Sequence, residues 1–235
     1  MLRLGALDEL ALAGPEHLDP HYVEGYDRKA RFDPEPDLAL LRSRALSAGS
    51  TLVDLGAATG TFALAAASEA GRVVAVDVSP TMVAAAQAKA ARRGATNVEC
   101  VQAGFLSYEH TGEPADFVYS RNALHHLPDF WKAVALERIA ALLRPGGVLR
   151  LRDIVFAFEP SEATTRIAAW LETAAPNTKA GWTREELERH VREEHSTFSW
   201  LLEPMLERAG FRIEQAEYGS LRIYAEYLCV RRPPA

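Results

Sequence analysis

Short apolar runs alternate with segments of helical character through the middle of the chain. The runs at residues 51–55, 72–77, 97–101, 115–120 and 148–156 have the length and composition of strands buried on both faces of a parallel sheet. The segments between them are alanine-rich or amphipathic, and several end in glycine, as helices commonly do. Strands that alternate with helices in this way predict βαβ units and right-handed crossovers.

The pattern differs on both sides of this core, which we place at residues 51–156. Residues 1–50 predict a helical cap broken by prolines, and residues 157–209, rich in Glu and Arg, predict a helical insertion or lid after the fifth strand. Residues 210–235 alternate as an antiparallel hairpin around Gly219. The expected fold is an α/β, Rossmann-like, doubly wound sheet of seven strands, mostly parallel with an antiparallel C-terminal strand.

Composition limits the partners of such a domain. The chain has 235 residues and a formal net charge of −6, and its basic residues are dispersed, so no electrostatic footprint for nucleic acid is present. Cys100 and Cys229 lack metal-ligand spacing, so neither a disulfide framework nor a metal site is expected. No signal peptide and no apolar run of about 20 residues is found. We therefore expect a cytoplasmic protein, a monomer or homodimer, that binds a small molecule and no membrane.

A loop of small residues follows the first buried strand. Gly56 and Gly60 bound this loop, in which a ligand can approach the backbone and free helix N–H groups can meet an anionic group. Its spacing differs from the dinucleotide pattern G-x-G-x-x-G, because Ala58 takes the third position. Asp54, just before the loop, would repel a diphosphate and attract an ammonium or a sulfonium. The pattern therefore favours S-adenosylmethionine over a nicotinamide dinucleotide.

A second carboxylate ends the next strand. Asp77 lies where Rossmann-like sheets place an acidic side chain that receives both ribose hydroxyls. A carboxylate accepts hydrogen bonds only, so it can take two O–H donors at once. The two strand ends together predict a nucleoside site at one edge of the sheet.

Four segments in this order resemble the motifs of the class I S-adenosylmethionine-dependent methyltransferases, especially the small-molecule enzymes of ubiquinone and menaquinone biosynthesis. Residues 54–60 resemble the motif D-x-G-x-G-x-G, with Ala58 at its middle glycine, a mild departure if the φ of Ala58 stays negative. Residues 76–82 resemble the second motif, and residues 116–127 and 142–149 resemble the fourth-strand loop and the approach to the fifth strand. The resemblance covers nearly half of the chain.

The resemblance implies a set of cofactor-binding residues at the strand ends. Gly104 stands where the family commonly has an aspartate against the adenine amino group, which leaves the backbone N–H of Phe105 for a ring nitrogen. Met82 fits a core position as well as an adenine contact, and Tyr26 fits either a lid over the methionine part or cap packing. The implied contacts are Tyr26, Asp54, Gly56, Ala58, Gly60, Asp77, Val78, Met82, Gly104, Phe105, Ser120 and Arg121.

The acceptor side of the site is less defined. His125 and His126 fit either a general base or a structural turn, so no catalytic residue is assigned. The expected reaction is in-line methyl transfer from S-adenosylmethionine to a small-molecule acceptor, which needs no catalytic triad or metal. The alternative is a sensor or assembly subunit that binds S-adenosylmethionine or an adenine nucleoside without methyl transfer.

Overall fold

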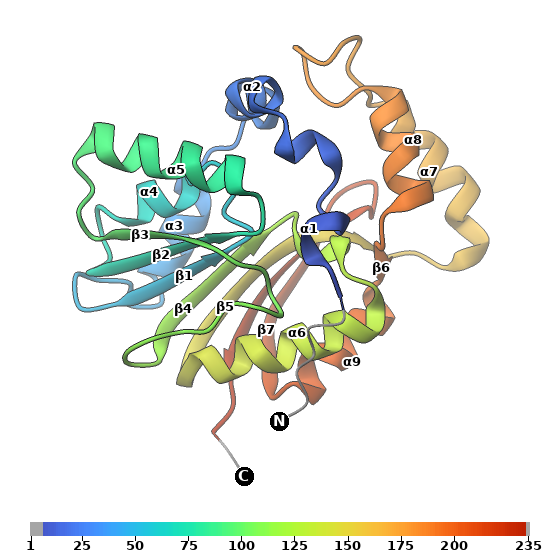
Figure 1. Cartoon of the computed structure of the whole chain (residues 1–235). Helices are drawn as coiled ribbons and strands as arrows, with labels where there is room; N and C mark the ends of the chain where they lie inside the picture. Colours follow the sequence, from blue (N-terminus) through green and yellow to red (C-terminus); the bar gives the residue numbers. More distant parts are fainter. Residues whose placement is uncertain (1–6, 234–235) are drawn as a thin grey trace.

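One mixed sheet runs through the molecule, as a computed structural model of residues 7–233 shows (Figure 1). The first six residues of the expected cap and the last two of the expected hairpin lie outside the described residues. The strands are β1 (Thr51–Leu55), β2 (Arg72–Asp77), β3 (Val98–Gln102), β4 (Ala115–Arg121), β5 (Leu143–Phe156), β6 (Thr197–Phe198), β7 (Phe211–Tyr218) and β8 (Tyr224–Arg231). Their order is β3-β2-β1-β4-β5-β8-β7, with β6 paired to β5 outside this path.

The sheet confirms the predicted fold class. β1 pairs in parallel with β2 and β4, so Asp54 lies beside Ala75 on one neighbour and Tyr119 on the other. β8 runs antiparallel to both β5 and β7, as expected for a C-terminal hairpin. The predicted count of seven strands is wrong by one, because two residues of the expected helical insertion extend to pair with the end of β5. A two-residue strand carries too little periodicity to be recognised in sequence.

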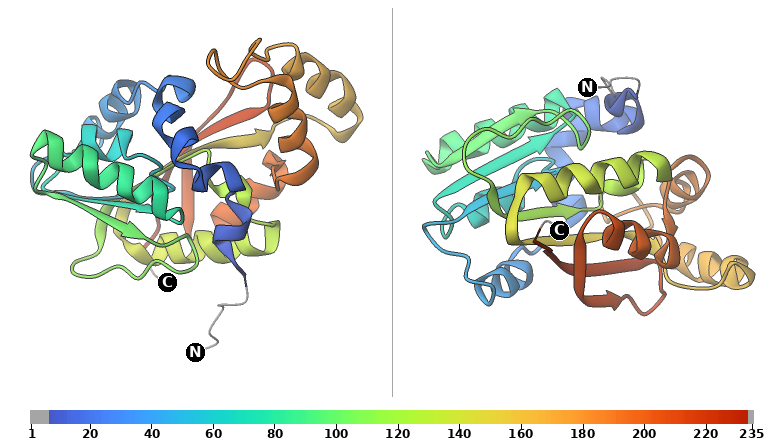
Figure 2. Two further views of the ribbon diagram at one scale, coloured as in Figure 1. Left: turned by 45° about the horizontal axis from the view of Figure 1, so that its top comes forward. Right: turned by 90° about the horizontal axis from the view of Figure 1, so that it is seen from below.

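Helices cover both faces of the sheet. In Figures 1 and 2, α3, α4 and α5 lie on one face, whereas α6 and α9 lie on the other. The α-helices are α1 (Glu9–Leu12), α2 (Pro20–Ala30), α3 (Glu35–Arg42), α4 (Thr61–Ala66), α5 (Pro80–Arg93), α6 (Asp129–Leu142), α7 (Ala163–Leu171), α8 (Arg184–Glu193) and α9 (Ser199–Arg208), and the short 3₁₀ turns are η1 (Pro15–Leu18), η2 (Leu124–His126) and η3 (Pro160–Glu162). None of the helices within residues 7–233 is long and apolar enough to span a bilayer.

Alternate residues of the central strand enter the two cores. Val53 packs in a cluster with Leu136 of α6, whereas Leu52 packs with Leu41 of α3 and Phe62 of α4. All of these side chains are buried, which explains why the strand reads as a continuous apolar run. Asp54 is the next-to-last residue of β1, just before the loop. Its side chain lines a cavity rather than the core.

The helical cap is tied to the strand-end loops by one carboxylate. Asp27 of α2 accepts a hydrogen bond from Thr59 in the loop after β1 and another from Thr61 at 3.2 Å, and it forms an ion pair with Lys89 of α5. These contacts hold α2 above the carboxyl edge of β1 and β2, where Figure 2 shows it on the same side as α7 and α8. The cap and the insertion thus enclose one edge of the sheet from two directions.

Candidate functional site

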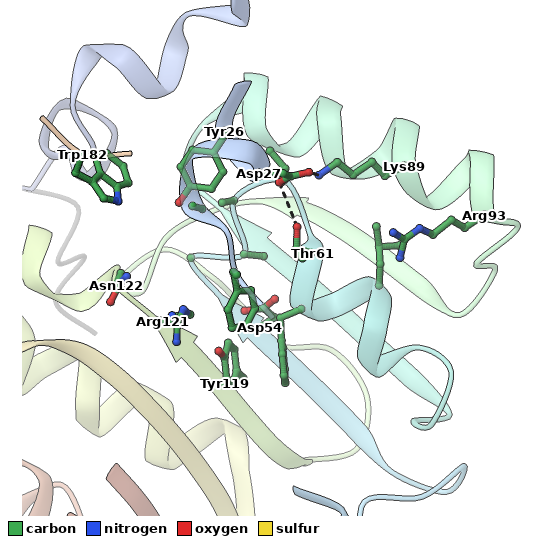
Figure 3. Close-up of a pocket in the computed structure, with 18 residues that line it drawn as sticks. Tyr26, Asp27, Asp54, Thr61, Lys89, Arg93, Tyr119, Arg121, Asn122 and Trp182 are labelled. Atoms are coloured by element: carbon green, nitrogen blue, oxygen red, sulfur yellow. Dashed lines mark hydrogen bonds and ion pairs between the residues drawn. The ribbon is translucent and has the colours of Figure 1, made fainter. Parts of the chain in front are cut away.

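Three neighbouring cavities open at the carboxyl ends of the central strands. The loop cavity lies between α2 and the loop after β1, and the strand-end cavity lies beside the end of β2. The third, which we call the histidine cavity, lies between η2 and α8. Tyr26 and Asn122 line all three, so the cavities meet around these two residues. Figure 3 shows both residues in the lining of the loop cavity.

The loop after β1 keeps a tight conformation that two of its positions explain. Gly56 has φ +75°, and a Cβ there would lie 2.3 Å from the Cβ of Ala123, so only glycine fits. Ala58 has φ +47°, so the expectation of a negative φ is wrong. Its N–H donates to Asp77 Oδ2 at 2.8 Å, and this bond to a carboxylate holds the left-handed conformation, which for a residue with a Cβ costs about 1–2 kcal/mol.

Asp54 and Asp77 form a coupled acidic pair at this edge. Asp54 is 2% exposed, and its Oδ2 atom has no hydrogen-bond partner. Burial, and then the nearby charge of Asp77, raise the pKa of Asp54 to about 8. Burial also raises the pKa of Asp77, although its two backbone donors, the N–H groups of Ser79 and Ala58, oppose that rise. Asp54 is therefore largely protonated in the free protein at neutral pH and ready to ionise beside a cation.

Most of the predicted cofactor residues come together around the first two cavities. Those that line a wall are Tyr26, Asp54, Gly56, Ala58, Asp77, Val78, Met82, Phe105 and Arg121. Met82 is 1% exposed and lies in the first turn of α5, where its N–H donates to Oγ of the N-cap Ser79, so its side chain is part of both the interior and the cavity wall. Figure 3 shows Asp54 below Tyr26, with Arg121 and Asn122 at the side toward Trp182.

Three predicted residues do not line a cavity. Gly60 has φ +78° and packs against Ala86, so it shapes the loop from behind. Ser120 is fully buried at the end of β4, and its Oγ atom has no hydrogen-bond partner. Gly104 is covered by a side chain from the cap, which occupies the space that a Cβ would need.

That covering side chain is Glu9, a residue that the sequence motifs did not reveal. A Cβ on Gly104 would lie 2.3 Å from Glu9 Oε1, and both carboxylate oxygens accept from the N–H of Leu106 at 3.1 Å. Glu9 Oε2 also accepts from Ser107 Oγ, and Glu9 lines the strand-end cavity together with Phe105. The cap thus supplies a carboxylate at the position where the chain lacks an aspartate. The one sequence feature that points to Glu9 is the glycine at position 104.

The histidine pair occupies η2, and its two members differ. His125 is buried with Nδ1 against Asp153 Oδ1 and Nε2 2.9 Å from Glu194 Oε2. Burial alone would lower its pKa, but the charges of Asp153 and Glu194 outweigh burial and raise that pKa to about 9. For His126, burial and then the neighbouring His125 charge lower the pKa to about 3. Neither imidazole has the near-neutral pKa that suits a general base.

The first two cavities pass a test of fit for an S-adenosylmethionine-like ligand. The unpartnered Oδ2 of Asp54 suits an ammonium, because an ionised carboxylate buried without a partner would be strongly destabilised. Gly56 lines both cavities, and Asp77 keeps lone pairs beyond those taken by its two backbone donors. The residues present therefore match a ligand with a cationic end and a ribose.

Comparison with known proteins agrees with this chemistry. Residues 52–147 match a family model described as a methyltransferase domain. Over this stretch, which is less than half of the chain, the Rossmann-like core is similar to methyltransferase domains, and the cofactor that this similarity supports is S-adenosylmethionine. The likeness does not single out the enzymes of ubiquinone and menaquinone biosynthesis.

Individual relatives are similar to this chain over little more than half of its length. An uncharacterized methyltransferase of Geobacillus kaustophilus is 30% identical over 134 residues, which cover 57% of this chain and 60% of that protein. A ribosomal protein L11 methyltransferase of Symbiobacterium thermophilum is 32% identical over 136 residues, 57% of this chain and 42% of that protein. The matched region thus spans less than two thirds of these relatives.

Solved structures share the fold across a larger part of the chain. Magnesium protoporphyrin IX methyltransferase from Synechocystis, solved with bound SAM, has a TM-score of 0.66 and 17% identity, covering 97% of this chain and 99% of that one. A SAM-dependent methyltransferase from Aquifex aeolicus has a TM-score of 0.62 and 20% identity, covering 90% and 98%. The cap and the insertion are therefore included in the shared architecture.

Proposed function

We propose that this protein transfers a methyl group from S-adenosylmethionine to a small-molecule acceptor bound in the histidine cavity. The observation that carries the proposal is the meeting of three cavities around Tyr26 and Asn122. S-adenosylmethionine that extends along the loop and strand-end cavities would lie next to the histidine cavity. An acceptor in the histidine cavity would then face the cofactor across Tyr26 and Asn122.

The cofactor would be held by residues from four strand ends and the cap. Asp77 would accept the ribose hydroxyls, and Asp54 would ionise against the ammonium. The guanidinium of Arg121, which stacks 4.3 Å from the ring centre of Phe32, would face the methionine carboxylate. Glu9 would accept from the adenine amino group in place of the aspartate that Gly104 replaces, next to the backbone N–H of Phe105.

The remaining predicted contacts would shape this site rather than pair with the ligand's charges. Gly56, Ala58 and Gly60 would keep the loop close to the methionine part. Val78 and Met82 would pack on the adenine. Ser120 would offer its unpartnered Oγ at the end of β4.

Bound S-adenosylmethionine supplies an electrophilic methyl group on a sulfonium, which needs little further activation. The chain's own contribution is therefore to align the acceptor atom with that methyl group and to exclude water. α2 does the latter, because Asp27 anchors it to Thr59, Thr61 and Lys89 over the edge of the sheet. The reaction is an in-line displacement in which the acceptor's lone pair forms the new bond and the C–S electrons return to sulfur.

The acceptor would be a compact molecule with apolar or aromatic character. Four aromatic side chains line the histidine cavity together with acidic Glu16 and Glu186: Tyr26, Trp170, Trp182 and Tyr224. Aromatic walls that also carry charged groups suit a compact acceptor with both a ring and a polar group. This lining agrees with the small-molecule methyltransferases that the sequence motifs resemble, including those of ubiquinone and menaquinone biosynthesis.

The test is incubation with S-adenosylmethionine labelled in the methyl group and fractionated small-molecule extracts. We expect label in a product from at least one fraction with the wild-type chain and none with Asp77→Ala. Stoichiometric binding of S-adenosylmethionine with no labelled product in any fraction would instead favour a sensor or an assembly subunit.

A further inference from the structure

Two histidines and one glutamate meet in the wall of the histidine cavity, outside the cofactor contacts. They are His125 of η2, His190 of α8 and Glu194, the residue that follows α8. One donor atom from each lies within 4.8 Å of the other two. His190 and Glu194 are four residues apart at the end of α8, whereas His125 comes from a distant segment, so the sequence does not reveal the whole group.

The contacts within this group do not form ordinary hydrogen bonds. His125 Nε2 lies 2.9 Å from Glu194 Oε2, and His190 Nδ1 lies 2.6 Å from the same oxygen. Glu194 Oε2 is nevertheless a buried atom with no hydrogen-bond partner, because neither imidazole approaches it with hydrogen-bond geometry. Two ring nitrogens and a carboxylate oxygen this close together fit an arrangement in which all three contact one ion.

The outward nitrogen of each imidazole is held by a polar partner. His125 Nδ1 bonds Asp153 Oδ1, and the same carboxylate accepts from the backbone N–H of Ile154 at 2.7 Å. His190 Nε2 bonds Ser196 Oγ at 2.7 Å. A carboxylate or hydroxyl on the far nitrogen is the usual device that fixes the tautomer and ring orientation of a metal-binding histidine. Both rings are thus fixed in orientation, with the inner nitrogen close to Glu194 Oε2.

We infer that His125, His190 and Glu194 bind a divalent transition-metal ion in the wall of the histidine cavity. Two imidazoles and one carboxylate suit zinc or non-haem iron, and three protein ligands leave at least one coordination position free. Because all three residues line the cavity, that position faces the space assigned to the acceptor. The inference stands without the proposed methyl transfer, since it rests on the donor set alone.

Direct metal binding tests the inference on the intact chain. The purified protein is stripped with a chelator and titrated with Zn²⁺ by calorimetry and with Co²⁺ by visible absorption. We expect one ion per chain, with a Co²⁺ spectrum of nitrogen and oxygen ligation. Absence of a stoichiometric site in the folded wild-type chain would overturn the inference and leave the group as an ion-pair cluster that joins α8 to η2.

Variants locate the site. His190→Ala and Glu194→Gln should each weaken Zn²⁺ binding at least tenfold, and Asp153→Asn, a positioning change, should weaken it on the order of 10- to 100-fold. His195→Ala is the matched control, because His195 is the neighbour of Glu194 and only its backbone N–H contacts His125. Unchanged Zn²⁺ affinity in Glu194→Gln, or an equal loss in His195→Ala, would contradict the assignment. S-adenosylmethionine binding, measured separately, distinguishes this outcome from failure of the proposed function.

Discussion

The proposed cofactor half and the proposed acceptor half of this edge of the sheet are built in different ways. The cofactor half uses loops that directly follow β1, β2 and β4, so most of its residues lie within short motifs. The acceptor half joins η2 to the insertion and brings His125 together with Glu194, 69 positions further along (194 minus 125). The difference teaches that the residues that bind a ligand shared by a fold lie in short sequence motifs. The residues for the chemistry particular to one chain are brought together by tertiary contacts.

This contrast can be tested with one measured quantity, the affinity for S-adenosylmethionine. Changes in the cofactor half should lower it, and changes in the acceptor half should not. The variants below run from the largest expected loss to none.

The largest loss is expected for Asp77→Ala. Two hydrogen bonds to a charged acceptor, at about 1.5 kcal/mol each, correspond to a loss of affinity on the order of 100-fold. The loop would also lose the carboxylate that holds Ala58, so circular dichroism should first show that the variant is folded. Asp77→Asn, which keeps one acceptor oxygen, should lose less. Affinity within about threefold of wild type in folded Asp77→Ala would remove Asp77 from the site.

A smaller loss with a distinct pH dependence is expected for Asp54→Asn. The pKa of Asp54 is about 8 in the free protein, so a cationic ligand must displace its proton. Wild-type affinity should therefore rise with pH below 8, by up to about tenfold per pH unit, until the ligand's own α-amino group titrates near 7.7–8.0. Asp54→Asn should flatten this rise. Identical slopes for the two chains between about pH 6 and 7.5 would show that Asp54 does not ionise on binding.

The same raised pKa has a consequence for stability. A carboxyl that stays protonated when folded and ionises when unfolded makes the free protein less stable as pH rises toward the folded pKa. Between about pH 4 and pH 8 this group should lower the free energy of unfolding, and Asp54→Asn should remove that part of the slope. Denaturant titrations across this range measure the difference.

A several-fold loss is expected for Glu9→Ala. One hydrogen bond of about 1 kcal/mol to the adenine corresponds to roughly fivefold in affinity. Gly104→Ala should give a similar loss, because the added Cβ would lie 2.3 Å from Glu9 Oε1 and displace the carboxylate. The double variant should be no weaker than Glu9→Ala alone, since both changes remove one contact. Additive losses would show that Gly104 acts independently of Glu9.

No loss is expected for Glu194→Gln, the matching change in the acceptor half. Its carboxylate contacts His125 and His190 and does not line the loop or strand-end cavity. S-adenosylmethionine affinity should stay within about twofold of wild type. A loss comparable to that of Asp77→Ala would mean that the two halves form one coupled site.

Much of the fold was predictable because its strands are buried on both faces. β1, β2 and β4 read as short, mostly apolar runs, and Gly56 after β1 marks a turn. The edge of the sheet where the predicted cofactor residues gather followed from the rule that parallel strands end together. β6 was missed because two residues carry no periodicity and pair only after the insertion has folded back.

The remaining features depend on tertiary contacts. Ala58 takes a positive φ because Asp77, 19 residues later, binds its N–H. Glu9 reaches Gly104 from a cap helix nearly one hundred residues away in sequence. The pairing of His125 with Asp153 and Glu194 likewise needs β5 and α8 in place, so the sequence could offer only a histidine pair of undecided role.

The claim on which both halves depend is that the strand-end and loop cavities bind S-adenosylmethionine. Isothermal titration calorimetry of the wild-type chain tests it most directly. We predict binding of one molecule per chain that S-adenosylhomocysteine competes away and NADH does not. Absence of binding to the folded chain, or competition by NADH, would contradict the account.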